Sequence, residues 1–294
     1  MSAAFASRSL QRLTQWTLGV VGLYALAAGV LWGAQRHLIF EPQRTLSIHA
    51  EQLPFQVQEL RIPVGPAGQS LAAWWIPPRG PDGKLFLYFH GNDGNIADSI
   101  GETELIRGLG HGVLMVDYRG YGESDGGFPS EAKMYQDAEA ALAFASARLG
   151  FASRDIFVYG HSLGSAVAID LAAKHPELGG LVAESAFTSM RDMANLQARY
   201  AMFPVDLFLT QRFESLRKAE TLSIPVLYIH GTADEVVPYA MGETLFARSG
   251  GRKAFVRVEG GRHDDNRQVA PEQIQAALRQ LVDDSNATVI ASRR

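Results

Sequence analysis

Cysteine is absent from this 294-residue chain, and neither a basic tract nor an internal repeat is visible. The missing cysteines exclude disulfides, thiolate catalysis and cysteine-based metal sites, and they fit the cytosol and the periplasm equally well. With a net charge of −4 and no basic stretch beyond the two terminal arginines, the chain lacks the electrostatic features of a nucleic-acid-binding protein. The histidines also lack the His-Glu-x-x-His spacing of a zinc site, so we expect no metal, no cofactor and no nucleic-acid partner.

Charged residues are missing from one long stretch near the N-terminus, Trp16 to Ala34. At about 1.5 Å per residue, a helix of this length can cross the roughly 30 Å hydrocarbon core of a bilayer, and the tryptophans near its ends lie where interfacial aromatic residues are enriched. The stretch predicts a single transmembrane anchor at 16–34 after a short segment at 1–15. Two alternatives remain: a signal peptide cleaved at Ala25-Leu26-Ala27, and a buried helix of a soluble domain. The apolar run continues past Ala27, which favours the anchor.

The orientation of such an anchor is weakly encoded. Arg8 and Arg12 precede the apolar stretch while Arg36 and Arg44 follow it, so the positive charges are nearly balanced. A short N-terminus inside, with the following domain on the non-cytoplasmic or periplasmic side, is the default expectation.

Residues 38–284 alternate between strand and helix patterns. Apolar and polar residues alternate at 57–62, as in a half-exposed strand, and a second strand is expected at 70–76. A turn at Gly65-Pro66 would join the two strands into an antiparallel hairpin at one sheet edge. Continuous buried runs rich in β-branched and aromatic residues then predict parallel strands covered by helices on both faces. We expect these strands at 85–89, 113–116, 156–159, 181–183, 226–229 and 254–258, and helices at 96–109, 130–149 and from 165 to about 174. The prediction is one α/β domain with a mostly parallel eight-stranded sheet, followed by a C-terminal tail at 285–294.

The alternation breaks between Ser185 and Ile224. A connection this long is unusual unless it has helices of its own and a function. We therefore expect a small helical cap at about 186–223, over the carboxyl edge of the sheet. Its methionines and aromatic residues have two explanations, packing within the cap or contact with a substrate in the pocket below.

The chain is organised around Val158 to Ala166, which contains Gly-His-Ser-Leu-Gly. A serine on a tight strand-to-helix turn has strained backbone angles that only small neighbours tolerate, and it lies near a helix N-terminus, which favours negative charge. We expect Ser162 to be a nucleophile. The alternative is a chance match in a chain with 29 glycines, but a strand pattern before the motif and a helix pattern after it argue against chance.

A serine nucleophile needs a general base and a carboxylate that orients this base. Two loops follow consecutive predicted strands, His-Gly-Thr-Ala-Asp at 230–234 and Gly-Gly-Arg-His at 260–263. Because functional groups of parallel sheets collect at the carboxyl ends of the strands, we expect these loops to be neighbours. We predict His263 as the base and Asp234 as the orienting acid, in the chain order Ser, Asp, His.

Other acids and histidines compete for these roles. Glu235, Asp264 and Asp265 are adjacent in sequence to the predicted acid or base, but adjacent acids cannot easily fold back onto the imidazole. His161 and His230 are expected to have structural roles in packing or hydrogen bonding.

Five motifs give the chain a family resemblance: His-Gly-Asn-Asp-Gly-Asn at 90–95, Asp-Tyr-Arg-Gly-Tyr-Gly-Glu-Ser at 117–124, Gly-His-Ser-Leu-Gly at 160–164, and the two loops at 230–234 and 260–263. Their order resembles the α/β-hydrolase superfamily. More narrowly, it is similar to membrane-anchored α/β-hydrolase-domain proteins grouped with the serine aminopeptidase-like (S33) hydrolases. The resemblance runs from about residue 40 to 281. It implies the α/β-hydrolase fold and an activity among those of esterases, thioesterases that remove acyl groups from proteins, lipases and peptidases.

Acyl transfer also needs hydrogen-bond donors directed at the oxyanion. In the α/β-hydrolase fold these are the backbone N–H of the residue after the nucleophile and an N–H from the loop after the third strand. Here the donors would be Leu163 and Asn92. Alternatively, the glycines of the loop at 90–95 serve only to form its turn. Phosphate binding by this loop is not expected, because no Gly-Lys-Ser/Thr follows it.

The sequence therefore predicts a membrane-anchored serine hydrolase that cleaves a small-molecule, lipid-like or protein-borne acyl ester or thioester through an acyl-enzyme. An aminopeptidase or amidase with the same three residues is one alternative, although no acidic pair stands out to hold a substrate amine. A non-catalytic binding module with the hydrolase fold is another. Such modules usually lack one of the three residues or a glycine of the turn, and all are present here.

Overall fold

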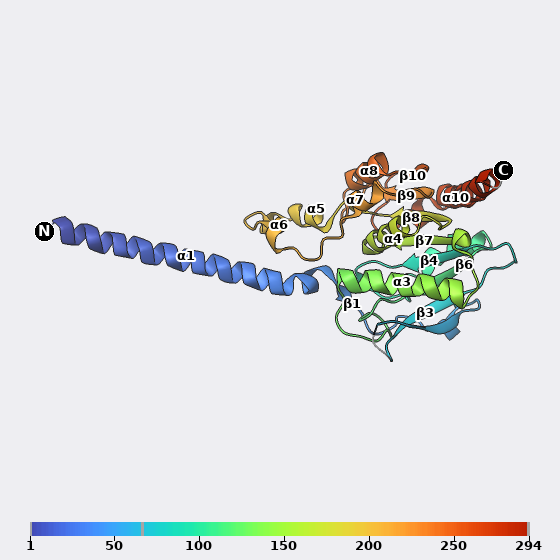
Figure 1. Ribbon diagram of the computed structural model, residues 1–294, viewed down its shortest axis with the longest axis horizontal. Coiled ribbons are helices and arrows are strands. Elements are labelled where there is room, and N and C mark those ends of the chain that lie inside the picture. The colour runs from blue at the N-terminus through green and yellow to red at the C-terminus, as the bar shows by residue number, and fades with distance from the viewer. Residues whose placement is uncertain (1, 66–67, 293–294) are drawn as a thin grey trace.

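The computed structural model describes the backbone of residues 2–65 and 68–292 and the side chains of residues 13–65 and 68–286. Figure 1 shows that helix α1 (Ser2–Ile39) extends away from an α/β body formed by the other described residues. The helix is longer than the apolar stretch on both sides. Its last turn is attached to the body, because the Arg36 side chain donates hydrogen bonds to the carbonyl oxygens of Phe128 and Pro129.

The body is built on a sheet of eight strands in the order β10-β9-β8-β7-β4-β6-β3-β2. Only β3 runs antiparallel to its neighbours, β2 and β6, and all other pairs are parallel. The strands are β2 (Gln58–Pro63), β3 (Ser70–Ile76), β4 (Leu85–Phe89), β6 (Gly112–Val116), β7 (Ile156–His161), β8 (Gly180–Glu184), β9 (Val226–Gly231) and β10 (Lys253–Val258). The predicted mostly parallel eight-stranded sheet is confirmed, including the hairpin at one edge. Of the turn predicted at Gly65-Pro66, Pro66 lies outside the described residues.

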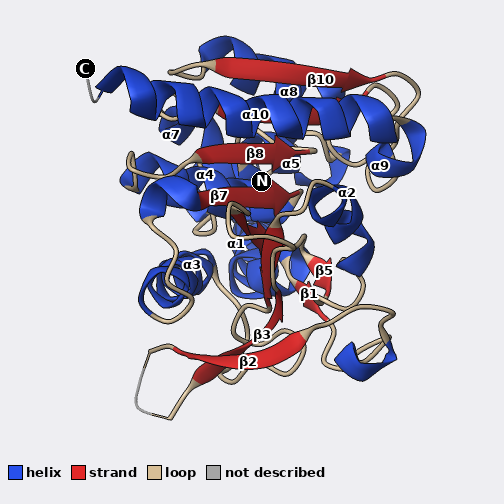
Figure 2. Cartoon of the chain, turned by 90° about the vertical axis from the view of Figure 1, so that its right-hand side faces the viewer, coloured by secondary structure: helices blue, strands red, loops and turns tan. Residues whose placement is uncertain are grey.

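Helices cover both faces of the sheet. One apolar core cluster lies under α3 (Glu131–Ala147), α4 (Leu163–Lys174) and α8 (Tyr239–Arg248). The other lies under α2 (Thr103–Gly108) and α10 (Pro271–Ser292), which Figure 2 shows in front of the sheet. The helix α10 continues through most of the segment expected as a tail. The short helix α9 (Asn266–Val269) precedes it, and single 3-10 turns occur at Ala50–Gln52, Ile100–Glu102, Ser153–Asp155 and Ala198–Tyr200.

The prediction of a helix at 96–109 is wrong over the first half of this range. Residues 95–98 form a turn in which the Asp98 carboxylate accepts the backbone N–H of Asn95, and the Asn95 side chain accepts that of Ala97. Short polar side chains that bond the local backbone in this way compete with a helix. The α-helix therefore begins only at Thr103.

The cap consists of α5 (Met190–Asn195), α6 (Val205–Phe208) and the 3-10 turn between them. It is shorter than the segment expected from the sequence, since α7 (Ser215–Ala219) belongs to the body. Lys218 of α7 lies 2.7 Å from Asp170 of α4. Figure 1 shows α5 and α6 on the side of the body toward which α1 extends.

A two-stranded parallel sheet was not anticipated. Strand β1 (Glu41–Pro42), directly after α1, pairs with β5 (Asp93–Gly94). This pairing joins the base of the N-terminal helix to the loop that follows β4.

Candidate active site

Ser162 lies on the turn between β7 and α4, with φ 52° and ψ −119°. A positive φ is uncommon for a non-glycine residue and is retained where the surroundings enforce it. The flanking glycines make the turn possible. A Cβ atom on Gly160 would lie 2.2 Å from the carbonyl oxygen of Gly164, and one on Gly164 would lie 2.1 Å from that of Phe89. The Ser162 N–H donates to the carbonyl of Glu184 on β8 at 3.0 Å, which fixes the turn to the sheet.

The structure brings Ser162, His263 and Asp234 together from three separate loops. Nε2 of His263 is 2.9 Å from Oγ of Ser162, and Nδ1 of His263 is 2.9 Å from Oδ2 of Asp234. Asp234 follows β9 and His263 follows β10, so each side chain is carried by the carboxyl end of a strand. With a proton on Nδ1, His263 donates to the carboxylate and accepts the serine proton at Nε2. This is the geometry that activates a serine hydroxyl.

The Asp234 carboxylate is fully buried and accepts several hydrogen bonds. It accepts the backbone N–H groups of Val236 and Val237 at 2.9 and 2.8 Å, and Nε2 of His230 lies 3.2 Å away. Burial raises the pKa of Asp234, but hydrogen bonds from His230 and His263 outweigh burial and hold the pKa well below its usual range. The group is therefore a carboxylate at neutral pH. His230 also contacts the carbonyl of Val237, which fits the structural role expected of it.

The competing acids do not reach the ring of His263. Glu235 forms an exposed ion pair with Arg262, and Asp265 accepts the backbone N–H of Arg262. Asp264 is exposed and faces His161.

The loop after β4 approaches Ser162 closely. A Cβ atom on Gly91 would lie 3.6 Å from Cβ of Ser162. The carbonyl of Asn92 accepts the Tyr121 hydroxyl at 2.7 Å and the Glu41 N–H at 2.9 Å, and the Asn92 side chain donates to the carbonyl of Ile39 at 3.2 Å. Within the described part of the chain, the backbone N–H groups of Asn92 and Leu163 have no hydrogen-bond partner. Two free N–H groups beside a serine can stabilise an oxyanion.

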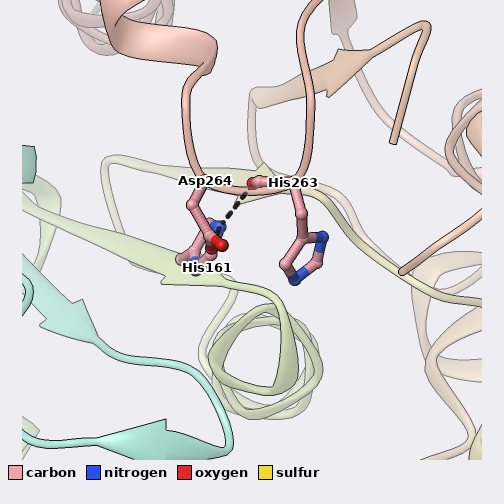
Figure 3. A group of neighbouring side chains, drawn as sticks. All are labelled: His161, His263 and Asp264. Atoms are coloured by element: carbon pink, nitrogen blue, oxygen red, sulfur yellow. Dashed lines mark hydrogen bonds and ion pairs between the residues drawn. The ribbon is translucent and has the colours of Figure 1, made fainter. Parts of the chain in front are cut away.

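His161 precedes the serine and contacts the backbone of His263. Its Nε2 is 3.0 Å from the carbonyl oxygen of His263 and 3.7 Å from a carboxylate oxygen of Asp264 (Figure 3). The donor atoms of these three residues lie within 4.8 Å of one another, which is close enough to suggest a metal site. Both ring nitrogens of His263 are already engaged by Ser162 and Asp234, so a metal here would have to displace one of those hydrogen bonds. We therefore assign no metal to this group.

A buried polar network lies behind the site, and the sequence did not predict it. Glu184, at the end of β8, accepts hydrogen bonds from the Tyr159 hydroxyl at 2.5 Å and from the Asn266 amide at 3.1 Å. Burial, and then the charge of Glu184, raise the pKa of Glu102 to about 7 against the opposing charges of His161 and Arg267. Burial lowers the pKa of His161, but Glu184 and Glu102 outweigh it and raise that pKa overall. Only the position of Glu184 at a strand end could have indicated this network.

The fold and the loops at the carboxyl edge of its sheet define an α/β-hydrolase. Residues 85–213 match the family model described as Serine aminopeptidase, S33. The chain is 33% identical to an uncharacterized protein of Mycobacterium tuberculosis, over 84% of this chain and 88% of that protein. It is also 32% identical to alpha/beta hydrolase domain-containing protein WAV2 of Arabidopsis thaliana, over 67% of this chain and 70% of that protein. The chain therefore belongs to the α/β-hydrolase superfamily, as an S33-like hydrolase.

Solved structures show the same fold. An esterase of Pyrococcus furiosus superposes with a TM-score of 0.66 at 20% identity and covers 84% of this chain and 98% of that one. Est1E of Butyrivibrio proteoclasticus, bound to ferulic acid, superposes with a TM-score of 0.64 at 20% identity and covers 78% of this chain and 99% of that one.

Proposed function

We propose that this protein is a membrane-anchored serine hydrolase that cleaves carboxylic esters or thioesters. The observation that carries the proposal is the continuous hydrogen-bonded path from Ser162 through His263 to the buried Asp234. The structural neighbours include an esterase of Pyrococcus furiosus, which agrees with an acyl-transfer activity.

In the proposed reaction, Nε2 of His263 takes the proton of Ser162 as Oγ attacks the acyl carbon. Asp234 remains ionised and stabilises the imidazolium that forms. The N–H groups of Leu163 and Asn92 bind the oxyanion of the tetrahedral intermediate. His263 then gives its proton to the leaving alcohol or thiol, and an acyl-enzyme on Ser162 remains. Water, deprotonated by His263, releases the carboxylic acid and restores the serine.

The proposed anchor is α1, which is long and apolar enough to cross a membrane. The most apolar 18-residue stretch within Leu13–Ile39 has a mean hydropathy of 1.7, and 6% of that stretch is buried within the protein. Large apolar side chains such as Leu23 and Leu26 are exposed along it. A hydrocarbon environment would cover this surface without any further protein contact. We place the body on the non-cytoplasmic side by default, and protease protection of membrane vesicles tests this orientation.

An aminopeptidase or amidase activity is the second candidate, because the matching family model has that description. A peptide substrate with a free amine would need an unpaired acid near the serine. In the cap, as far as the structure describes it, Asp206 lies 3.2 Å from Arg191, and Glu214 at the cap's end lies 3.1 Å from Arg217. Neither of these two acids is free to bind a substrate amine.

The test is labelling of the full-length protein with a fluorophosphonate probe, which reacts with activated serines. Wild-type protein is expected to be labelled, and Ser162→Ala is expected to lose the label while keeping its thermal unfolding temperature. Retained labelling of Ser162→Ala would refute the assignment, and an unlabelled wild type would favour a binding module. Comparison of p-nitrophenyl esters, acyl thioesters and aminoacyl anilides then separates the activities, and faster cleavage of the anilides would favour the peptidase.

A further inference from the structure

A cavity of ≈ 230 Å³ lies between the N-terminal helix and the cap. Helix α1 contributes one wall with Leu31, Trp32 and Ile39, and the cap contributes the other with Met193, Phe203 and Phe208. Polar side chains also line the cavity. Gln35 is hydrogen-bonded to the backbone of the cap, and the guanidinium of Arg199 lies over the ring of Tyr200. Gln197 and Tyr200 line it as well. The rest of the cavity is suited to an uncharged hydrocarbon chain.

The cap is attached to α1 over several turns of the helix. The Tyr24 hydroxyl donates to the carbonyl of Met202 at 2.9 Å, and the Tyr24 ring stacks on Phe203 with 5.4 Å between centroids. Further along α1, the Gln35 side chain accepts the backbone N–H of Thr210 at 2.7 Å. The anchor is therefore part of the cavity wall, and is not merely a tether for the body.

The cap exposes apolar side chains beside the apolar part of α1. Leu207 is 80% exposed and Met202 is 75% exposed, and Leu196 is also exposed. The hydrogen bond from Tyr24 to Met202 places this surface at the level of the apolar stretch of α1. An exposed apolar surface on a helix-anchored domain is stabilised by contact with lipid. With α1 as the proposed anchor, the outer end of the cavity would face the hydrocarbon of the bilayer.

The inner end of the cavity adjoins the candidate oxyanion loop. Ile39 lines the cavity, and its carbonyl oxygen accepts the side-chain N–H of Asn92. A chain whose tail lies between α1 and the cap would thus have its carbonyl end on the side of the loop that carries Asn92.

We propose that the cavity between α1 and the cap binds the acyl chain of a lipid ester taken from the bilayer, so that the anchor helix forms part of the substrate site. This inference rests on the proposed serine hydrolase activity. It assigns Leu31 and Trp32 as residues that determine chain length. Short acyl esters do not reach these residues, and their hydrolysis does not depend on them.

The test uses full-length protein in lipid nanodiscs with p-nitrophenyl acetate and p-nitrophenyl palmitate. Leu31→Trp fills the cavity and is expected to lower kcat/KM for the palmitate by about tenfold or more, because an acyl pocket discriminates by the space it offers. The acetate rate is expected to stay within about twofold of wild type, since its acyl group lies outside the cavity. Leu26→Trp is the matched control, because Leu26 is exposed on α1 outside the cavity lining, and it should leave both rates unchanged. The proposal would be overturned if Leu31→Trp changed kcat/KM equally for both esters or left both values unchanged.

Two further measurements separate the possible failures. Labelling of Ser162 by a short fluorophosphonate should persist in Leu31→Trp; absence of labelling in wild type would instead refute the proposed hydrolase. A long-chain phosphonate with a diazirine near its alkyl end should crosslink to peptides from 28–39 and 190–209, and this readout does not depend on a folded variant. Crosslinks elsewhere on the body would contradict the cavity as the chain site.

The source of the chain is tested with one acyl group in two forms. A monoacylglycerol in the nanodisc is expected to be cleaved faster than an S-palmitoyl peptide, and cleavage of both should fall in Leu31→Trp because both carry the same acyl chain. Faster cleavage of the peptide would contradict a lipid substrate and favour an acylated protein.

Discussion

The ring of His161 contacts the backbone of His263, with 3.0 Å between Nε2 and the carbonyl oxygen. The Ser185 hydroxyl donates to the same carbonyl at 3.1 Å. The loop that carries the proposed general base is thus held by two side chains, one before the proposed nucleophile and one at the end of β8. We therefore expect His161 to be a positioning residue, which acts on the proposed reaction through the orientation of His263.

Replacement of His161 by phenylalanine should lower kcat with little change in KM. The aromatic ring still fills the space, but it cannot donate to the His263 carbonyl, so the imidazole loses its alignment with Ser162. We expect kcat to fall by about tenfold or more, as misplacement of a catalytic group does. His161→Gln keeps an N–H donor and should recover part of the loss. Equal activity of the phenylalanine variant and wild type would contradict the positioning role.

The orienting role of Asp234 predicts a large loss of activity in a folded protein. Asp234→Asn keeps an oxygen that accepts the N–H groups of Val236 and Val237, but its amide cannot stabilise an imidazolium. By analogy with other serine triads, kcat should fall by about 10⁴-fold. Glu235→Gln is the control, because Glu235 only pairs with Arg262 at the surface. Steady-state kinetics on an activated ester check both variants, and a fall of similar size in the control would contradict the assignment of the acid.

The close packing of the turn predicts that Gly164→Ala is strongly destabilising. The new Cβ atom would meet the carbonyl oxygen of Phe89, which is backbone and cannot move away cheaply. The free energy of unfolding should fall by about 3 kcal/mol or more. Gly80→Ala should be nearly neutral, since a Cβ atom there has nothing within 4 Å. Denaturant unfolding of the two variants makes the comparison, and equal stability would show that the turn is looser than described.

The buried network behind the site predicts a pH dependence of stability. The pKa of Glu102 is raised from 4.5 to about 7, first by burial and then by Glu184, and the pKa of His161 is also raised. Both groups bind protons more tightly in the folded than in the unfolded protein. The stability that each group contributes is present below its pKa in the unfolded protein. It is lost as the pH rises through the pKa of the same group in the folded protein. The thermal unfolding temperature should therefore fall as the pH rises from 4.5 to about 7.

Glu102→Gln should flatten this fall, because glutamine has no proton to lose. Glu104→Gln is the matched control, since Glu104 contacts the same Arg267 from an exposed position. An unchanged slope in Glu102→Gln would show that the group does not titrate in this range.

The strands and the site loops could be read from the sequence because their signals are local. Buried apolar runs located six strands of the main sheet, the hairpin pattern located the other two, and two glycines around a serine located the turn at Ser162. Asp234 and His263 were found because parallel strands bring their carboxyl ends to one edge. The error at 96–109 is local too, since Asn95 and Asp98 favour a turn that apolar periodicity does not reveal.

Contacts between distant segments could not be predicted. The hydrogen bond from Asn92 to Ile39 and the stacking of Tyr24 on Phe203 each join the N-terminal helix to parts of the chain that share no sequence pattern with it. The network of Glu102, Glu184 and His161 likewise depends on three separate segments, a 3-10 turn and the ends of β8 and β7, that meet only in the folded chain. The proposed acyl site depends on the first two contacts, so the sequence alone does not reveal it.

The most direct test of the central claim is mass spectrometry of the full-length protein quenched in acid during turnover of an activated ester. The proposed mechanism predicts that the peptide containing Ser162 gains the mass of the acyl group, and that the adduct is absent from Ser162→Ala. An acyl adduct on another residue, or ester turnover by Ser162→Ala at the wild-type rate, would contradict it.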